Sequence, residues 1–311
     1  MARHVLSISD LGPENLARLI NRSLEIASTD LCRWQSLRGR IVGIYFRRSS
    51  TRTRTAFTAG AIRLGATPVA YGPGDLQLVT GETSQDTAKV LSEFLDILVI
   101  RTNESINEMR EMAAQNRMSI VNAMSDNEHP TQGITDLVTL KEEFGRLQGI
   151  HVLYVGEGNN TAAALALGVS MTPGMRLTLV TPEKYGLPDK VLKEVRGFAD
   201  EYGSHVEQHH ALNKLPKKVD AVYATRWQTM GEPKPDPDWR DLFAPYRVTQ
   251  DLMAEVSKPS GTIFMHDLPA VRGADVDSEV LDGPQSRAFR QAWHKLTAAM
   301  AILEWCVSPG L

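Results

Sequence analysis

A run of hydroxyl and guanidinium side chains over residues 50–54, Ser-Thr-Arg-Thr-Arg, carries the clearest chemical signal in this sequence. It lies between an apolar run over 41–45, typical of a buried strand, and a pattern over 56–64 that predicts a helix. A strand-to-helix turn presents backbone N–H groups and the positive end of the helix dipole. Hydroxyl donors and charge-assisted bonds from arginine add to these groups. The run therefore predicts a site for a phosphate-bearing anion, and a capped helix with solvated arginines is the plainer alternative.

Four further motifs follow along the chain. They are Arg101 at the end of an apolar run, His129-Pro130-Thr131-Gln132, Gly156-Glu157-Gly158-Asn159-Asn160 and His266-Asp267-Leu268-Pro269. Together with the run over 50–54, their order and spacing resemble those of the aspartate/ornithine carbamoyltransferase family over residues 40–300. The resemblance implies an enzyme that moves the carbamoyl group of carbamoyl phosphate to the amino group of an amino acid and releases phosphate.

The resemblance also implies a role for individual positions, which composition alone does not. Thr53, Arg101 and His129 would act in catalysis by stabilising the oxyanion that develops on the carbonyl oxygen. The positions implied to bind carbamoyl phosphate are Ser50, Thr51, Arg52, Thr53, Gln77, Arg101, His129, Gln132, Asp267, Leu268 and Lys295. Gln77 lies in the segment that family trimers lend to a neighbouring active site. Lys295 stands in place of a family arginine, and we expect Arg101 and His129 at the carboxyl ends of strands.

The motifs for the second substrate combine two patterns of the family. The positions implied are Asn160, Thr225, Arg226, Gln228, Thr229, Met230 and Asp267. Asn160, Thr229 and Met230 resemble the ornithine type, whereas Arg226 and Gln228 resemble the aspartate type.

Two positions depart from the ornithine type. Thr225 replaces its aspartate, and Asp267 replaces its cysteine. Because a buried carboxylate is costly unless a cation pairs with it, we expect Asp267 to face a positive group on the acceptor or to pair with Arg272. We also expect ornithine to be a poorer acceptor than a related diamino acid or a specialised-metabolism amine.

Alternating strand and helix patterns must position these residues. Apolar runs predict strands at 41–45, 68–71, 97–100, 119–122, 151–155, 176–180, 221–223 and 262–265. Helical patterns cover 56–64, 83–94, 106–114, 131–144, 161–170 and 288–305. The alternation predicts an α/β fold of two doubly wound parallel-sheet domains, with the C-terminal helix packing back.

We expect two domains with different ligands. Residues 1–132, with the helix over 288–305, would bind carbamoyl phosphate. Residues 133–287 would bind the amino acid. The proline- and acid-rich stretch 233–238 is typical of a mobile loop.

Bulk composition restricts the class of protein. The chain has 311 residues, 42% of them hydrophobic and 23% charged, which suits two globular domains. A net charge of −3 does not indicate nucleic-acid binding, which is typical of basic proteins. No apolar run reaches the ~18 residues that a membrane-spanning helix needs. The N-terminus lacks a signal-peptide pattern. The two cysteines, Cys32 and Cys306, are expected to be small core residues of a cytoplasmic protein.

The expected partners are carbamoyl phosphate and an amino-acid amine, with no nucleic acid and no membrane. The resemblance implies a homotrimer with shared active sites. It requires no metal and no organic cofactor, since positioning and electrostatics supply the catalysis.

Two alternatives remain open at the level of sequence. Gly156 and Gly158, with Ala162 and a later Glu183, form a loose dinucleotide-binding pattern that would suit an NAD(P)-binding oxidoreductase. A non-catalytic paralogue that binds a ligand would tolerate the departures at Thr225, Asp267 and Lys295.

Overall fold

The computed structural model describes residues 2–29, 34–228 and 233–308. The chain forms two compact units. Unit 1 comprises the residues up to Val138 and the segment from Trp293 onward, and unit 2 comprises Thr139–Ala292. The boundaries fall inside two helices, α5 (Pro130–Phe144) and α11 (Ala288–Val307).

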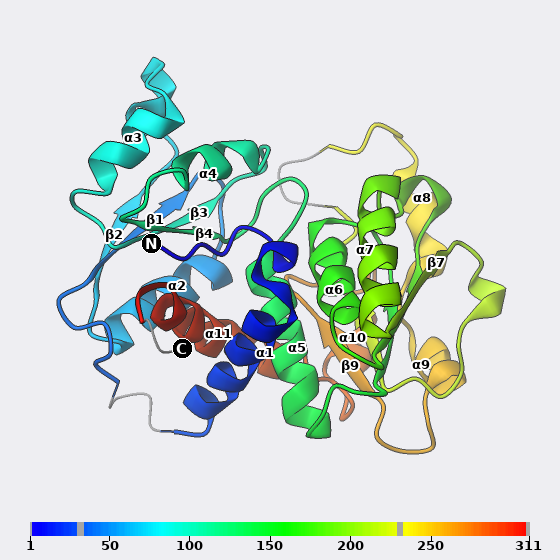
Figure 1. Cartoon of the computed structure of the whole chain (residues 1–311). Helices are drawn as coiled ribbons and strands as arrows, with labels where there is room; N and C mark the ends of the chain where they lie inside the picture. The colour runs from blue at the N-terminus through cyan, green and yellow to red at the C-terminus, as the bar shows by residue number, and fades with distance from the viewer. Residues whose placement is uncertain (1, 30–33, 229–232, 309–311) are drawn as a thin grey trace. The chain divides into compact units, whose positions relative to one another are not determined.

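Unit 1 is built on a parallel sheet of strand order β2-β1-β3-β4. Its strands are β1 (Ile41–Phe46), β2 (Thr67–Tyr71), β3 (Ile97–Arg101) and β4 (Ser119–Asn122). Its other helices are α1 (Ile8–Ala27), α2 (Arg52–Arg63), η2 (Gln77–Thr80), α3 (Ser84–Leu91) and α4 (Asn107–Met112) (Figure 1). The order reverses between β1 and β3, and such a reversal leaves a crevice at the carboxyl ends of the two strands.

Both faces of the first sheet are covered by helices. On one face, Ala88 and Leu91 of α3 and Met109 of α4 pack in one cluster with alternate strand residues. On the other face, Gly60 of α2 lies against Met300 of α11, and a methyl group added to Gly60 would come 3.2 Å from the Met300 side chain. The strands are therefore buried on both sides, which explains their uninterrupted apolar sequences.

Unit 2 is a second parallel sheet, of strand order β7-β6-β5-β8-β9. Its strands are β5 (His151–Val155), β6 (Arg176–Val180), β7 (His205–His209), β8 (Ala221–Ala224) and β9 (Ile263–His266). Its helices are α6 (Asn160–Ser170), η3 (Glu183–Tyr185), α7 (Asp189–Tyr202), η4 (Leu212–Lys214), α8 (Trp239–Phe243), η5 (Ala244–Tyr246), α9 (Gln250–Val256) and α10 (Ser278–Leu281). Here the strand order reverses between β5 and β8.

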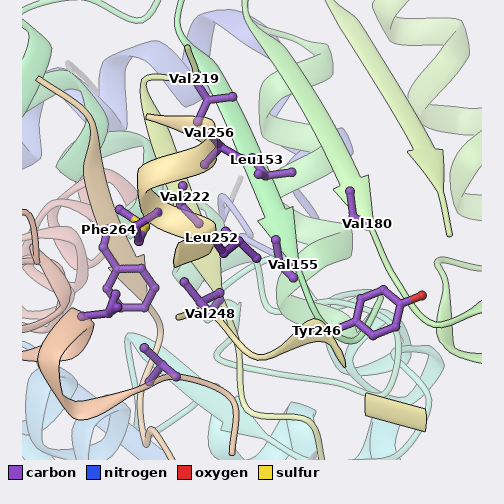
Figure 2. Packing of buried hydrophobic residues seen from close by; sticks show 14 of the residues in the cluster. Leu153, Val155, Val180, Val219, Val222, Tyr246, Val248, Leu252, Val256 and Phe264 are labelled. Atoms are coloured by element: carbon purple, nitrogen blue, oxygen red, sulfur yellow. The ribbon is translucent and has the colours of Figure 1, made fainter. Parts of the chain in front are cut away.

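One hydrophobic cluster of unit 2 lies between its sheet and the helices α9 and α10. Figure 2 shows Leu153, Val222 and Phe264 from three strands packed with Leu252 and Val256 of α9. Helix α6 is buried along its whole length, which fits a helix that is apolar all round. This packing sets the positions of β5, β8 and β9, and so of the residues that follow them.

Each predicted strand is confirmed to within one residue at either end, as are the α/β class and the parallel sheets. Helix α2 begins at Arg52, four residues before its predicted start. Strand β7 and the helices α1, α7, α8, α9 and α10 were not predicted from the sequence. Helix α1 is interrupted at Gly12, which has a φ of 70° and is followed by Pro13. Because of this interruption, its apolar positions do not follow one helical period.

Two sequence expectations depend on burial. The Cys306 side chain is buried, and burial raises the pKa of its thiol to about 12, as expected of a core residue; Cys32 lies outside the described residues. Among the described residues, no helix is both long and apolar enough to cross a membrane.

We expect the packing beneath β9 to dominate the stability of unit 2. Phe264→Ala should lower the free energy of unfolding by about 3–5 kcal/mol, because it removes a fully buried ring from the cluster. Phe289→Ala is the matched control: its ring is 60% exposed, so a change within about 0.5 kcal/mol is expected. Equilibrium urea unfolding measures both, and equal losses would contradict this account of the core.

Candidate active site

The N-terminus of α2 coincides with the hydroxyl and arginine run over 50–54. Thr51 is its N-cap residue, but no side chain makes a capping hydrogen bond there. The first-turn N–H groups of a helix have no intrahelical partner, and the helix dipole favours negative charge beside them. Ser50 and Thr51 directly precede the helix, and Arg52, Thr53 and Arg54 lie on its first turn.

The arginines of this region have different environments. Arg47 donates to the carboxylates of Glu104 at 2.7 Å and Glu108 at 2.6 Å, so its charge is compensated within unit 1. Arg54 is exposed and lies over the ring of Phe46, 5.3 Å from its centroid. These two side chains therefore have structural explanations that need no ligand.

A small cavity in unit 1 brings four predicted residues together. Thr53 of α2, His129 and Gln132 beside and within α5, and Lys295 of α11 line it with apolar neighbours. The cavity measures about 10 Å³, which is room for about one water-sized group. It can hold one small polar end of a ligand, whereas the rest of carbamoyl phosphate would have to lie outside it.

His129 is a neutral imidazole in this setting. Burial, followed by the positive charges of Arg101 and Lys295, lowers the pKa of His129 well below its usual range. The hydroxyl of Thr131 lies 3.2 Å from Nδ1. When this hydroxyl donates to Nδ1, the single ring proton lies on Nε2, where the ring donates a hydrogen bond without carrying charge.

The residue before His129 fixes its place, and sequence analysis missed it. The Glu128 carboxylate accepts hydrogen bonds from the Ser7 hydroxyl at 2.5 Å and from the Ile8 N–H at 2.7 Å. It therefore lies at the N-terminus of α1, where the helix dipole stabilises negative charge. The missing signal was α1 itself, whose start supplies both donors.

Gln132 is held from both ends of its amide. Its Nε2 donates to Asp136 at 2.6 Å, and its Oε1 accepts a hydrogen bond from the ammonium group of Lys295. A carbonyl oxygen can accept two hydrogen bonds. Lys295 thus orients Gln132 in this structure, and the oxygen retains one acceptor direction for a ligand.

In unit 2, a second set of polar side chains follows β5, β8 and β9. The Asn159 Oδ1 caps α6 by accepting from the N–H groups of Thr161 and Ala162, and its Nδ2 donates to the Thr225 hydroxyl at 3.3 Å. The Thr225 hydroxyl donates in turn to Asp267 Oδ1 at 3.2 Å. The Thr161 hydroxyl donates to Asp267 Oδ2 at 3.0 Å. The network joins the carboxyl ends of three strands to the start of α6.

The turn over residues 266–269 is held by a buried histidine. His266 Nδ1 accepts the Leu268 N–H at 2.8 Å, so the ring proton lies on Nε2, 2.7 Å from the Asp275 carboxylate. Leu268 has a φ of 54°, a left-handed conformation that costs a branched residue about 1–3 kcal/mol. These hydrogen bonds offset that cost and fix the direction of the Leu268 carbonyl group.

Lys234 provides a further polar anchor that sequence analysis missed. Its ammonium group pairs with Glu157 and lies 4.4 Å from the ring centroid of Tyr185 and 4.8 Å from that of Phe243. The stretch 233–238 was predicted to be a mobile loop. The Lys234 side chain is only 5% exposed and joins the start of this stretch to the β5–α6 loop.

Comparison with known proteins decides the family. A family model described as "Aspartate/ornithine carbamoyltransferase, carbamoyl-P binding domain" matches residues 3–142, and its partner, "Asp/Orn binding domain", matches residues 148–306. The ornithine carbamoyltransferases of Caldicellulosiruptor saccharolyticus and Methanothermobacter thermautotrophicus are each 36% identical over 304 residues, which are 97% of this chain and 97% and 98% of theirs. This chain belongs to the aspartate/ornithine carbamoyltransferase family.

Solved structures of the family share the fold. Ornithine carbamoyltransferase from Pyrococcus furiosus has a TM-score of 0.90 at 32% identity, over 100% of this chain and 98% of that chain. The enzyme from Giardia lamblia has a TM-score of 0.88 at 29% identity, over 100% of both chains. The predicted family, enzyme class and fold are therefore confirmed, and the chain is a carbamoyltransferase of this family.

Several sequence expectations for the site need correction. His129 does not end a strand, because β4 ends at Asn122 and His129 directly precedes α5. Asp267 does not pair with Arg272, whose guanidinium binds both oxygens of Asp282. Arg101 does end β3, as expected.

The structure also locates the remaining predicted positions. Asp267 and Leu268 belong to unit 2, whereas the other positions implied to bind carbamoyl phosphate belong to unit 1. Asn160 is buried at the start of α6, and Arg226 and Gln228 are partly exposed. Thr229 and Met230 lie outside the described residues. Within the described ranges, no three histidine, cysteine, aspartate or glutamate side chains are grouped to hold a metal ion.

The glycine pattern after β5 has a packing explanation. A methyl group added to Gly158 would lie 2.4 Å from backbone atoms of Gly186 and Leu187. Gly158 also donates its N–H to the Tyr185 carbonyl at 2.7 Å. The backbone that approaches this glycine is therefore the chain's own, which removes the main support for a dinucleotide site in this member of the carbamoyltransferase family.

We expect His129 to make stability fall at mildly acidic pH. The pKa of His129 is lowered in the folded state, so below about pH 6.5 the unfolded chain binds the extra proton first and stability declines as pH falls. The loss levels off below the folded-state pKa, and its slope is at most about 1.4 kcal/mol per pH unit. Urea unfolding of wild type and His129→Gln from pH 7.5 to 5 should show a flatter curve for the variant. Parallel curves would contradict a buried neutral imidazole.

Proposed function

We propose that this protein transfers the carbamoyl group of carbamoyl phosphate to the side-chain amine of an amino acid of the ornithine type. The observation that carries the proposal is the constellation in unit 1. A cavity lined by Thr53, a neutral His129, Gln132 and Lys295 lies at the helix that begins with the hydroxyl and arginine run. These groups suit a ligand with a dianionic end and a small polar end.

In the proposed reaction, each group meets one part of carbamoyl phosphate. Ser50, Thr51, Arg52 and Thr53, together with the first N–H groups of α2, bind the phosphate. Arg101 and the His129 Nε2–H donate to the carbonyl oxygen, on which negative charge develops as the amine attacks. Gln132 Oε1 accepts from the carbamoyl NH₂ group, and the resemblance adds the carbonyl groups of Asp267 and Leu268 as acceptors for it.

The chemistry then balances without a further reactant. The neutral amine nitrogen bonds to the carbonyl carbon, and the bond from that carbon to the phosphate oxygen breaks. The nitrogen loses one proton, which the departing phosphate accepts, and the products are a ureido compound and hydrogen phosphate. A neutral histidine suits this reaction because it stabilises the oxyanion by a hydrogen bond and does not protonate the attacking amine.

The same proposal assigns one substrate to each unit. Unit 1 would bind carbamoyl phosphate and unit 2 the amino acid, in agreement with the descriptions of the two matching family models. The names of the relatives support ornithine as the acceptor, whereas Thr225 and Asp267 led us to expect a poorer fit. Ornithine is therefore the first acceptor to test, with shorter and longer diamino acids beside it.

The proposal includes a homotrimer with shared active sites. Gln77 is exposed on η2, and its Oε1 is 2.9 Å from the Thr80 hydroxyl, so it does not line the cavity in its own unit. The same short helix carries an exposed apolar side chain, Val79, which is 65% exposed. An exposed apolar side chain beside Gln77 supports contact of this segment with another subunit.

Loss of the Arg52 guanidinium tests the proposed phosphate site. With ornithine as acceptor, wild type should release phosphate and form ureido product in equal amounts. Arg52→Ala should lower kcat/KM for carbamoyl phosphate by about 30- to 5,000-fold, the equivalent of about 2–5 kcal/mol for a lost ionic partner. Arg54→Ala, two residues further along the same helix, should stay within about threefold because its side chain is exposed. A folded Arg52→Ala variant with near wild-type turnover would refute the proposed site.

Subunit mixing tests the shared site. Arg52→Ala and Gln77→Ala should each be impaired, but trimers reassembled from both should regain activity, since some sites would then carry neither lesion. Arg52→Ala mixed with Arg101→Ala is the control, because both lesions fall in the site of one subunit and no intact site can form. Verified reassembly without any regain in the first mixture would refute the role of Gln77.

A further inference from the structure

Asp267 is a carboxylate held in place by hydroxyl groups. Its Oδ2 accepts from Thr161 at 3.0 Å and its Oδ1 accepts from Thr225 at 3.2 Å. The three residues come from the start of α6 and from the positions that directly follow β8 and β9. Ala224 and His266 are paired in the register of these strands, so residues 225 and 267 leave the sheet side by side.

No cation of unit 2 compensates this carboxylate in the described part of the chain. Its one ion-pair candidate is His266 Nδ1 at 3.5 Å, but this nitrogen accepts the Leu268 N–H and carries no proton. Arg272 is engaged by Asp282 instead. The Asp267 side chain is nevertheless only 16% exposed. A largely buried carboxylate without a cation is unfavourable, and a bound cation would remove that cost.

A diamino acid has two amino groups, and either could in principle pair with the Asp267 carboxylate. Their different roles in the reaction distinguish them. The reacting amine must lose its proton before it attacks. A carboxylate beside it would raise the pKa of that amine and oppose the loss. The α-ammonium group takes no part in bond making and remains charged throughout. A fixed carboxylate therefore favours turnover only where it faces the α-ammonium group.

We infer that Asp267 binds the α-ammonium group of the acceptor, with Thr161 and Thr225 as positioning residues for its carboxylate. The inference rests on the proposed function, and it names the group that selects α-amino acids over simple amines. Asn159 supports the same arrangement, since it joins Thr225 to the cap of α6. The acceptor class is then a diamino acid with a free α-amine.

Binding of two truncated acceptors tests this assignment without turnover. The first, 2-aminopentanoate, is ornithine without the side-chain amine, and the second, 5-aminopentanoate, is ornithine without the α-amine. In the presence of carbamoyl phosphate, calorimetry of the full-length protein should show that Asp267→Asn weakens binding of 2-aminopentanoate by about 10- to 100-fold, the range for a hydrogen bond to a charged group. Binding of 5-aminopentanoate should change by less than about threefold.

Control variants separate a local effect from misfolding. Asp267→Cys also lacks the charge and should give the same selective loss. Asp282→Asn removes a carboxylate that is 54% exposed and paired with Arg272, and it should bind both compounds as wild type does. The affinity for carbamoyl phosphate should also remain within about threefold in Asp282→Asn, since this residue has no proposed contact with either substrate.

Two results would overturn the inference. One is equal binding of 2-aminopentanoate by wild type and Asp267→Asn. The other is an equal loss for both compounds, which would place the carboxylate at a group they share. Absence of phosphate release from carbamoyl phosphate with any diamino acid would instead refute the proposed function, so the two failures are distinguishable.

Discussion

In a parallel sheet, the carboxyl ends of all strands lie at one edge, and a crevice that can hold a ligand opens at that edge where the strand order reverses. Both units of this chain obey this constraint. The run at the start of α2 follows β1, and Arg101 is the last residue of β3; these are the two strands at the reversal in unit 1. Asn159 and Thr225 follow β5 and β8, the corresponding strands of unit 2. The functional groups are thus positioned by the apolar cores beneath them.

The two units present opposite charges at these edges. In unit 1, Arg101 and Lys295 are cations near a histidine that burial keeps neutral, and the helix dipole of α2 adds positive potential. In unit 2, the carboxylate of Asp267 is held by hydroxyl groups. A phosphate dianion and an ammonium group are complementary to these two environments. The electrostatics therefore support one anionic and one cationic substrate, in keeping with the family to which the chain belongs.

Sequence patterns predicted those features that depend on one stretch of chain. Buried parallel strands are short, apolar and bounded by turn residues, so each predicted strand was found within one residue. Helix α1 was missed because Gly12 and Pro13 break its period, and β7 was missed because its residues are polar and partly exposed. The motif at 50–54 could be found without a structure, since its residue types carry the chemistry.

Features that join distant segments could not be predicted in this way. The contact of Glu128 with the start of α1 links residues 120 positions apart, and Lys234 meets Glu157 across 77 positions. Asp267 and Thr225 were each noted as departures from the family pattern, but their hydrogen bond follows only from the pairing of β8 with β9. Side-chain partners of this kind require the sheet order, which one sequence does not reveal.

The discontinuity of unit 1 has a consequence for how the protein is made. Residues from Trp293 onward belong to the same unit as the first 138 residues, although all of unit 2 is translated between them. Lys295, which orients Gln132, leaves the ribosome only after the second sheet is complete. During synthesis, the apolar surface of unit 1 that α11 covers in the complete protein is therefore exposed to solvent. This surface is at risk of aggregation until α11 has been translated and packs against it. Unit 2 has all of its strands available earlier, so the two units should mature in the reverse of their order in the sequence.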